Sequence, residues 1–241
     1  MDAVENVHIG LLAPQTATEP HFASFRKLLP ANISLTIEGR SLAHTSRYEF
    51  AGRTDEFVAR AVDFVERHKV QGLIVAGAPV TLLNPDLEAR LAQAIRVPTV
   101  TAVAAAAAAL KALSARRLIL VTPFDSEINH RIEAYLRDRA LSVLFSPLFE
   151  DHEAGGASKT DPNELFERVK KILTEHPAAD AIYFQGAALD PLPIMDRMEK
   201  HFEICVVASN PAMLWHLLSR MGHRHCIDGY GKLLSSWPVP D

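Results

Sequence analysis

One pattern occurs twice in this sequence and limits the folds that the chain can adopt. An apolar run, LIVAG, ends at Gly77, and a second one, AIYFQG, ends at Gly186. The two glycines are 109 positions apart (186 − 77 = 109), and Pro14 and Pro123, which each follow another apolar run, have the same spacing. Two landmarks at one offset indicate an internal duplication of a unit of about 110 residues.

Each unit contains short apolar runs that alternate with segments of helical spacing. Runs without polar alternation, such as residues 7–13 and 118–122, are typical of strands buried on both faces of a parallel sheet. Residues 53–68 place Phe57 and Phe64 on one face at the period of a helix. This alternation predicts an α/β protein with two doubly wound, flavodoxin-like parallel-sheet domains, which are pseudo-symmetric and face a central cleft.

Composition and charge exclude several functional classes. The net charge of −4 gives no support for nucleic-acid binding, which usually needs a clustered basic face. The longest apolar run, residues 97–110, contains Pro98 and is shorter than the roughly 20 residues of a membrane span. The acidic N-terminus lacks the basic region of a secretory signal, and two cysteines are too few for a disulfide framework. We therefore expect a cytoplasmic protein that binds neither nucleic acid nor membranes.

No motif for a metal or a cofactor is evident. His223, His225 and Cys226 could ligate a metal, but no second cluster with metal-ligand spacing accompanies them. Gly10 is not followed by the glycine-rich run of a dinucleotide or phosphate site, and the Gly-x-Ser-x-Gly motif is absent. Cys205 lies inside an apolar run, which is typical of a buried structural thiol. We therefore expect no metal and no cofactor.

The carboxyl ends of the predicted strands are the expected position of a ligand, as in other doubly wound sheets. Backbone N–H groups near helix N-termini attract carboxylates, and polar side chains at the same edge could add hydrogen bonds. For each polar residue the alternative, that it only caps a helix, stays open. The candidate ligand-binding residues are Pro14, Gln15, Thr16, Gly77, Ala78, Pro79, Thr122, Phe124, Asp125, Ser126, Gln185, Gly186, Ala187, Ser209 and Asn210.

The order and spacing of these segments resemble the aspartate/glutamate racemase superfamily, and most closely its arylmalonate decarboxylase and maleate cis–trans isomerase branch. The resemblance extends over nearly the whole chain. It is carried by residues 9–14 (IGLLAP), 116–124 (RRLILVTPF), 128–129 (IN), 180–182 (DAI), 189 (L), 209–215 (SNPAMLW) and 229–233 (GYGKL). The same resemblance implies that the end of the chain returns to the first domain. We therefore expect a first domain of residues 1–113 and 215–241, and a second of residues 114–214.

The resemblance also implies which residues would carry the chemistry. In this superfamily, one strand end in each half carries a catalytic cysteine that acts as acid, base or nucleophile on a small carboxylate. The matching positions are Gly77 and Gly186, so the chain has neither thiol, whereas arylmalonate decarboxylases keep the second. The hydroxyls of the decarboxylase oxyanion pocket correspond to Ala78, Pro79 and Phe124, which have none. Loss of one oxyanion donor alone typically costs about 100-fold in rate.

Two functions from different classes follow. The first is a protein that binds a small carboxylate between its two domains without cysteine catalysis, and the missing thiols favour it. The second is a diverged, cofactor-independent lyase or isomerase that acts on a small mono- or dicarboxylate, which the otherwise intact scaffold allows. The sequence names no catalytic residue and leaves open whether the chain is an enzyme. A homo-oligomer is compatible with both functions.

Overall fold

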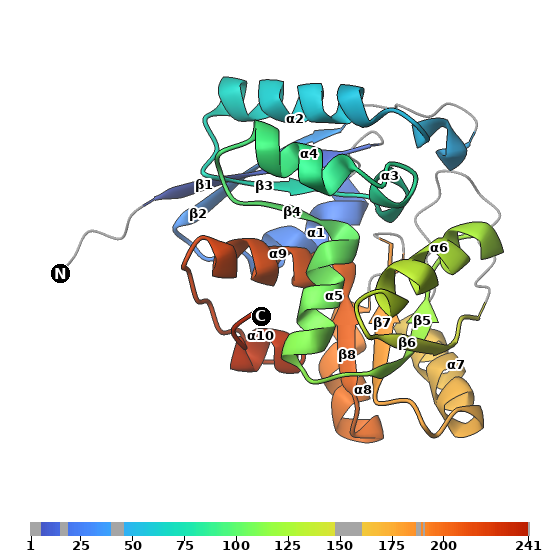
Figure 1. Cartoon of the computed structure of the whole chain (residues 1–241). Helices are drawn as coiled ribbons and strands as arrows, with labels where there is room; N and C mark the ends of the chain where they lie inside the picture. The colour runs from blue at the N-terminus through green and yellow to red at the C-terminus, as the bar shows by residue number, and fades with distance from the viewer. Residues whose placement is uncertain are drawn as a thin grey trace.

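The structure is a computed structural model that describes residues 6–14, 19–39, 46–147, 161–186, 189 and 191–240. These residues form two four-stranded parallel sheets with strand orders β2-β1-β3-β4 and β6-β5-β7-β8 (Figure 1). The two sheets have the same order when each is numbered along the chain, which agrees with a duplicated doubly wound unit. The strands are β1 (Val7–Ala13), β2 (Ile33–Gly39), β3 (Gly72–Val75), β4 (Thr99–Thr101), β5 (Arg117–Val121), β6 (Ser142–Phe145), β7 (Ala181–Phe184) and β8 (Cys205–Ala208).

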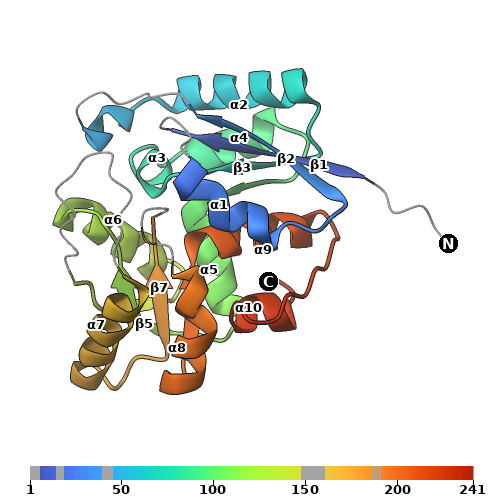
Figure 2. The same cartoon turned by 180° about the vertical axis from the view of Figure 1, so that it is seen from behind.

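Helices cover both faces of each sheet. In the first sheet, α2 and α4 lie on one face and α1 and α9 on the other, while α5 and α6 face α7 and α8 across the second sheet (Figures 1 and 2). The predicted α/β fold of two parallel-sheet domains is therefore confirmed. The helices are α1 (Glu19–Leu28), η1 (Arg47–Phe50), α2 (Thr54–His68), α3 (Ala78–Leu82), α4 (Leu87–Ala94), α5 (Ala102–Ala112), α6 (Ser126–Arg137), α7 (Pro162–Glu175), η2 (Leu192–Ile194), α8 (Met195–Phe202), α9 (Ser209–Arg220) and α10 (Lys232–Ser236).

Local sequence explains where several of these helices begin. Asp161 caps α7 by accepting hydrogen bonds from the N–H groups of Asn163 and Glu164, and Pro162 occupies the first helical position. Asp125 caps α6 in the same way through the N–H of Ile128. Each such cap stabilises its helix by about 1 kcal/mol relative to alanine.

The centre of the molecule is formed by α5 and α9, which pack directly against each other. The alanine run of α5 buries Ala105, Ala106 and Ala109, whose small side chains let the two helix backbones approach closely. Trp215 on α9 is fully buried, and its indole N–H donates to the carbonyl of Pro238 at 3.0 Å. This hydrogen bond ties the end of the chain to α9.

The last two helices contact both sheets. α9 packs on α1, β3 and β4 of the first sheet and also on β8 of the second, while α10 contacts α9 and β8. The assignment of residues 215–241 to the first domain stays a prediction. Of the helices in the described part of the chain, none combines the length and apolar character that a bilayer crossing requires.

Candidate functional site

The strand order creates one topological switch point in each sheet. The connections that follow β1 and β3 leave for opposite edges of the first sheet, and those that follow β5 and β7 do so in the second. Ligands of open α/β sheets bind at such points, beyond the carboxyl ends of the strands. Pro14 directly follows β1. Gly77, Pro123 and Gly186 each lie two residues after the end of a strand, β3, β5 and β7 respectively.

The backbone at the two switch points is the same. The N–H of Ala76 donates to the carbonyl of Leu12 at 2.9 Å, and the N–H of Gln185 donates to the carbonyl of Val121 at 2.9 Å. Each glycine then accepts a hydrogen bond three residues on, Gly77 from Val80 at 3.1 Å and Gly186 from Leu189 at 3.2 Å. The duplication therefore extends to the hydrogen bonds of the site.

Both glycines have conformations and surroundings that a side chain would disturb. Their φ angles are +96° at Gly77 and +117° at Gly186, in the region that only glycine adopts readily. A Cβ at Gly77 would lie 2.8 Å from Cγ of Pro14, and one at Gly186 would lie 2.9 Å from Cδ of Pro123. Each glycine thus packs against the proline that follows the neighbouring strand.

The strand ends of the two domains are joined through helices α3 and α6. Ala78 and Pro79 begin α3, Asp125 caps α6 and Ser126 begins it, and the two helices contact each other. The sequence predicted a loop after Gly77, where the structure has the short helix α3. Pro79 lies in the first turn of α3, where proline is well tolerated because its missing N–H has no partner to lose.

Several of the predicted polar residues are buried and have partners inside the protein. The hydroxyl of Thr122 donates to Oδ1 of Asn129 at 2.5 Å and accepts from the N–H of Phe124 at 3.1 Å. The side chain of Gln185 accepts a hydrogen bond from the hydroxyl of Tyr183. Ser209 and Asn210, the first residues of α9, are also buried. These contacts support a structural role for Thr122 and Gln185, and a ligand contact by any of the four stays a prediction.

Three of the candidate residues, Gln15, Thr16 and Ala187, lie outside the described residues. Among the described residues after Gly186, the first helical ones are those of η2, which begins at Leu192. Among the candidates in the described part of the chain, Asp125 and Ser126 lie at the start of α6, and Ser209 and Asn210 lie at the start of α9; each of these helices has 12 residues.

The sequence analysis missed two residues that the structure brings to the strand ends, Arg47 and Tyr48. The hydroxyl of Tyr48 donates to Oδ1 of Asp125 at 2.7 Å, and the guanidinium carbon of Arg47 lies 5.0 Å from the ring centre of Phe124. Both contacts join η1 of the first domain to the start of α6. A local signal existed, because Ser46 and Glu49 form a capping box, but the polar residues 40–52 around it show no helical or strand period.

The Tyr48–Asp125 contact sets the ionisation of both groups. Burial and the hydrogen bond to Asp125 raise the pKa of Tyr48 to about 12. Burial raises the pKa of Asp125, but the hydrogen bonds from Tyr48 and from the N–H of Ile128, with the charge of Arg47, outweigh it and lower the pKa below its usual value. Asp125 is therefore a carboxylate and Tyr48 a neutral donor at neutral pH.

A second polar cluster, in addition to the Tyr48–Asp125 contact, joins the two domains. Glu88 on α4 accepts hydrogen bonds from the hydroxyl of Thr101 at 2.5 Å and from the hydroxyl of Tyr135 on α6 at 3.0 Å. Arg139 lies 3.8 Å from the same carboxylate. Burial and the charge of Glu88 raise the pKa of Tyr135, which keeps it a donor. This cluster fixes α4 against α6 and contains none of the predicted site residues.

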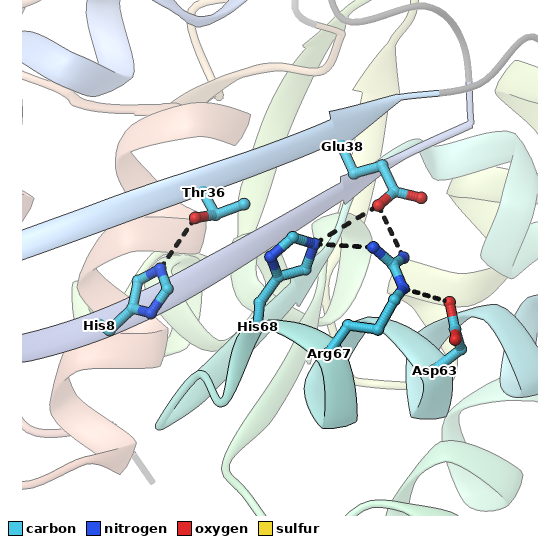
Figure 3. A network of polar contacts seen from close by, with 6 residues as sticks. All are labelled: His8, Thr36, Glu38, Asp63, Arg67 and His68. Atoms are coloured by element: carbon cyan, nitrogen blue, oxygen red, sulfur yellow. Dashed lines mark hydrogen bonds and ion pairs between the residues drawn. The ribbon is translucent and has the colours of Figure 1, made fainter.

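A polar network on the first domain has a structural role (Figure 3). Arg67, near the end of α2, donates to Asp63 and to Glu38 of β2, each at 2.8 Å, and His68 lies 3.6 Å from Glu38. Exposed ion pairs such as these contribute at most about 1 kcal/mol each. The network ties α2 to β2 and offers no nucleophile.

A cavity of about 420 Å³ lies at the open edge of β4, between α4, α5 and α9. Its walls include His216 and Arg220 but none of the predicted strand-end residues. Arg220 donates to the carbonyl of Thr99 on β4 at 2.8 Å. Burial, with a smaller contribution from the charge of Arg220, lowers the pKa of His216 from 6.5 to about 4.

This lowered pKa predicts a dependence of stability on pH. The folded state keeps His216 neutral, whereas the unfolded state binds a proton below pH 6.5, so the stabilisation is present above that pH and is lost toward pH 4. Between pH 7 and pH 5 the free energy of unfolding of the wild-type protein should fall by about 2 kcal/mol more than that of the variant His216→Gln. Urea unfolding of both proteins across this range measures the difference. Parallel curves for the two proteins would show that His216 is not responsible.

The cysteines do not lie at the strand ends. Cys205 is the first residue of β8, at the opposite end of the strand, and its thiol is half-buried, 3.9 Å from the carbonyl of Leu113. Burial raises the pKa of Cys205, so its thiol is protonated at neutral pH. Cys226 is exposed in the segment between α9 and α10. The sequence predicted a buried structural thiol; Cys205 lies within the sheet but is half-buried rather than buried.

Comparison with known proteins finds one family over most of the chain. A family model described as arylmalonate decarboxylase matches residues 9–234. The arylmalonate decarboxylase of Bordetella bronchiseptica is 24% identical over 188 residues, which cover 74% of this chain and 78% of that protein. The maleate isomerase of Alcaligenes faecalis is 21% identical over 142 residues, which cover 58% of this chain and 55% of that protein.

Solved structures of the same two kinds share the fold. A glycine-to-cysteine mutant of arylmalonate decarboxylase superposes with a TM-score of 0.81 at 22% identity, covering 94% of this chain and 99% of that one. The maleate isomerase Iso from Pseudomonas putida S16 gives a TM-score of 0.76 at 20% identity, with 96% and 99% covered. The fold predicted from the duplication is therefore the fold of these proteins.

Proposed function

Since this chain belongs to the arylmalonate decarboxylase family, we propose that it binds a small carboxylate between its two domains without cysteine-based catalysis. The observation that carries this proposal is the position of its thiols. The chain contains two cysteines, of which Cys205 lies at the amino end of β8 and Cys226 after α9. Neither follows the carboxyl end of a strand, where Gly77 and Gly186 occupy the two switch points.

Relatives support the importance of a thiol in family chemistry. One solved maleate cis–trans isomerase, from Nocardia farcinica, contains a covalently bound succinylcysteine intermediate. The geometry at Gly186 also supports the absence of a catalytic cysteine, because Pro123 occupies the space that a side chain at this position would need. A thiol cannot be placed there without a shift of the neighbouring strand end.

Relatives also support the class of ligand. The maleate isomerase Iso of Pseudomonas putida S16 has been solved with maleate, and a mutant of arylmalonate decarboxylase in a sulfate-associated form. Both are small anions. In this chain the anion would lie against Phe124 and the first turn of α6, beside the strand end at Gly186.

Two measurements on the purified protein test this function together. A thermal-shift screen of small carboxylates should raise the melting temperature with at least one of them, since a ligand that binds only the folded state stabilises it. Incubation in deuterated water with arylmalonate, maleate, aspartate and glutamate should leave each compound unchanged by NMR. Turnover of any of them, or deuterium at the α-carbon, would contradict the absence of catalysis.

The second candidate function, a diverged lyase or isomerase, rests on Asp125. Asp125 lies at the start of α6 beside the strand end and would be the proton acceptor for the α-carbon of a ligand in this function, but its lowered pKa makes it a weaker base than a free carboxylate. The exchange experiment separates the two functions. If deuterium enters a substrate and Asp125→Asn abolishes the exchange, the chain is an enzyme of this second kind.

A further inference from the structure

The cavity at the open edge of β4 has no part in the proposed function. Its volume is about 420 Å³, and it lies between α4, which covers one face of the first sheet, α9, which covers the other, and the start of α5 (Figure 1). Small-molecule sites in proteins typically have volumes of about 300–1,000 Å³. The cavity is therefore large enough for a ligand of the size of a substituted benzene.

Apolar side chains from three elements line part of the cavity. They come from α4 and the turn after it, from β4 and the residues before it, and from the start of α5. His216 of α9 adds an imidazole that its lowered pKa keeps uncharged at neutral pH. An apolar lining of this kind favours a ligand with an apolar group. The apolar residues on which this depends are Leu91, Ile95, Val97, Pro98, Val100 and Ala104.

Two arginines bring positive charge to the same cavity. Arg96 lies in the turn between α4 and β4, and no hydrogen bond or ion pair joins it to another residue in the described part of the chain. Arg220, the last residue of α9, uses Nη1 to donate to the carbonyl of Thr99 at 2.8 Å. A guanidinium has five N–H donors, so both arginines retain donors for a ligand.

The carboxylate that lines the cavity is compensated within the protein. Glu88 accepts hydrogen bonds from the hydroxyls of Thr101 and Tyr135, and it lies 3.8 Å from the guanidinium of Arg139. Because Arg139 balances this negative charge, the two arginines of the lining leave the cavity with a surplus of positive charge. Such a surplus favours an anionic ligand, and two guanidinium groups match a dianion better than a monoanion.

The edge of β4 favours a small ligand over a peptide or a second copy of the chain. In the described part of the chain β4 pairs with β3 alone, and the carbonyl of Pro98 accepts from Leu73 of β3 at 2.9 Å, so the backbone of Thr99 turns to the open edge. A peptide that added a strand would need the carbonyl of Thr99, which Arg220 already occupies. A second copy docked by the same edge would bring like charges together. A small anion meets neither obstacle.

We propose that this cavity is a second binding site, which takes a dianionic organic phosphate with an apolar group. Arg96 and Arg220 hold the phosphate, and the apolar lining holds the group that is esterified to it. The proposal goes beyond the proposed function and does not depend on it, because the cavity includes none of the predicted strand-end residues.

Isothermal titration calorimetry with phenyl phosphate, phenyl sulfate and inorganic phosphate tests this proposal. At about pH 8 the phosphate ester carries two negative charges and the sulfate ester, which has the same shape, carries one. Wild-type protein should bind phenyl phosphate at least about threefold more tightly than phenyl sulfate, since each exposed charge pair contributes up to about 1 kcal/mol. Inorganic phosphate should bind more weakly than phenyl phosphate, because it leaves the apolar lining unused.

A variant that fills the cavity locates the ligand without changing any charge. Ala104→Leu adds three carbon atoms at the start of α5, where Ala104 lines the cavity, and should remove measurable binding of phenyl phosphate. Ala108→Leu is the matched control and should bind as wild type does. Ala108 lies one turn further along α5, is half-buried like Ala104 and does not line the cavity.

A charge variant tests the role of the arginines. Arg96→Met should weaken phenyl phosphate binding about threefold to fivefold, the range expected for an exposed charge pair. Arg131→Met is its control, because Arg131 carries the same charge on α6, where it pairs with Glu127 at 2.8 Å, and this variant should bind as wild type does.

Each contrary outcome removes a stated part of the proposal. No measurable binding of phenyl phosphate to wild type, or unchanged binding to a folded Ala104→Leu protein, would overturn the site. Equal affinity for the two esters would overturn the dianion class, and inorganic phosphate binding as tightly as phenyl phosphate would overturn the apolar group. If far-UV circular dichroism shows that Ala104→Leu does not fold, Arg96→Met decides, and wild-type affinity in that variant overturns the site.

Discussion

Replacement of Gly186 by cysteine is expected to destabilise the protein by about 4 kcal/mol. Two costs add at this position. The φ angle of +117° disfavours any side chain, and a Cβ would lie 2.9 Å from Cδ and 3.0 Å from Cγ of Pro123. Strained dihedral angles and overpacking each cost about 1–3 kcal/mol. Urea unfolding monitored by tryptophan fluorescence measures the loss.

Gly222→Cys is the control that separates the two costs. Gly222 has a φ angle of +79°, and nothing lies within 4 Å of its ideal Cβ. This variant should lose only the dihedral cost, about 1–2 kcal/mol. Adding Pro123→Ala to Gly186→Cys should restore part of the stability by making room. A Gly186→Cys protein as stable as the Gly222→Cys control would show that Pro123 is not an obstacle.

The same variant tests whether the strand end is accessible. If Gly186→Cys folds, its thiol should react with iodoacetamide faster than Cys205, whose pKa burial raises. Peptide mapping of the alkylated protein compares the two cysteines directly. Labelling of the new cysteine no faster than that of Cys205 in a folded variant would show that Gly186 does not line an accessible site.

Asn84→Ala is the second substitution with a large expected effect, a loss of about 3–5 kcal/mol. Asn84 is 1% exposed. Its Nδ2 donates to the carbonyls of Phe50 and Val80, each at 2.8 Å, and its Oδ1 accepts from the N–H of Arg53 at 2.8 Å. Alanine would leave these backbone groups without their partner in a buried environment, where each unsatisfied group costs about 1–3 kcal/mol.

A surface asparagine supplies the control for this prediction. Asn163, in the first turn of α7, accepts one exposed hydrogen bond from Arg197 at 2.9 Å, and Asn163→Ala should cost less than about 1 kcal/mol. Equal stability of the two alanine variants would show that water replaces the lost hydrogen bonds at Asn84.

Much of the fold was predictable because it depends on local pattern. The strands β1 and β7 begin and end where their apolar runs do, and the cap at Asp161 marks the start of α7. The duplication indicated that both halves have the same strand order, which the two sheets show. Short helices escaped prediction, since α3 and η1 have too few residues to show a helical period.

The candidate site was harder to predict because its contacts are tertiary. Tyr48 and Asp125 are 77 residues apart, and no local pattern indicates that they meet. The sequence placed Thr122 and Gln185 at strand ends, but it could not show that Asn129 and Tyr183 are their hydrogen-bond partners. The positions of strand ends can thus be predicted from pattern, while side-chain direction depends on neighbours from other elements.

The pairing of each glycine with a proline also bears on how mutation can change this protein. Glycine codons that end in a pyrimidine become cysteine codons through a single nucleotide change, so mutation can supply a thiol at such a position directly. Accommodating it is another matter, because Pro14 or Pro123 fills the space beside the glycine. A change of the proline before or together with the glycine is therefore expected to be better tolerated than a change of the glycine alone. The two halves impose this order independently, so the route to a second thiol is as long as the route to the first.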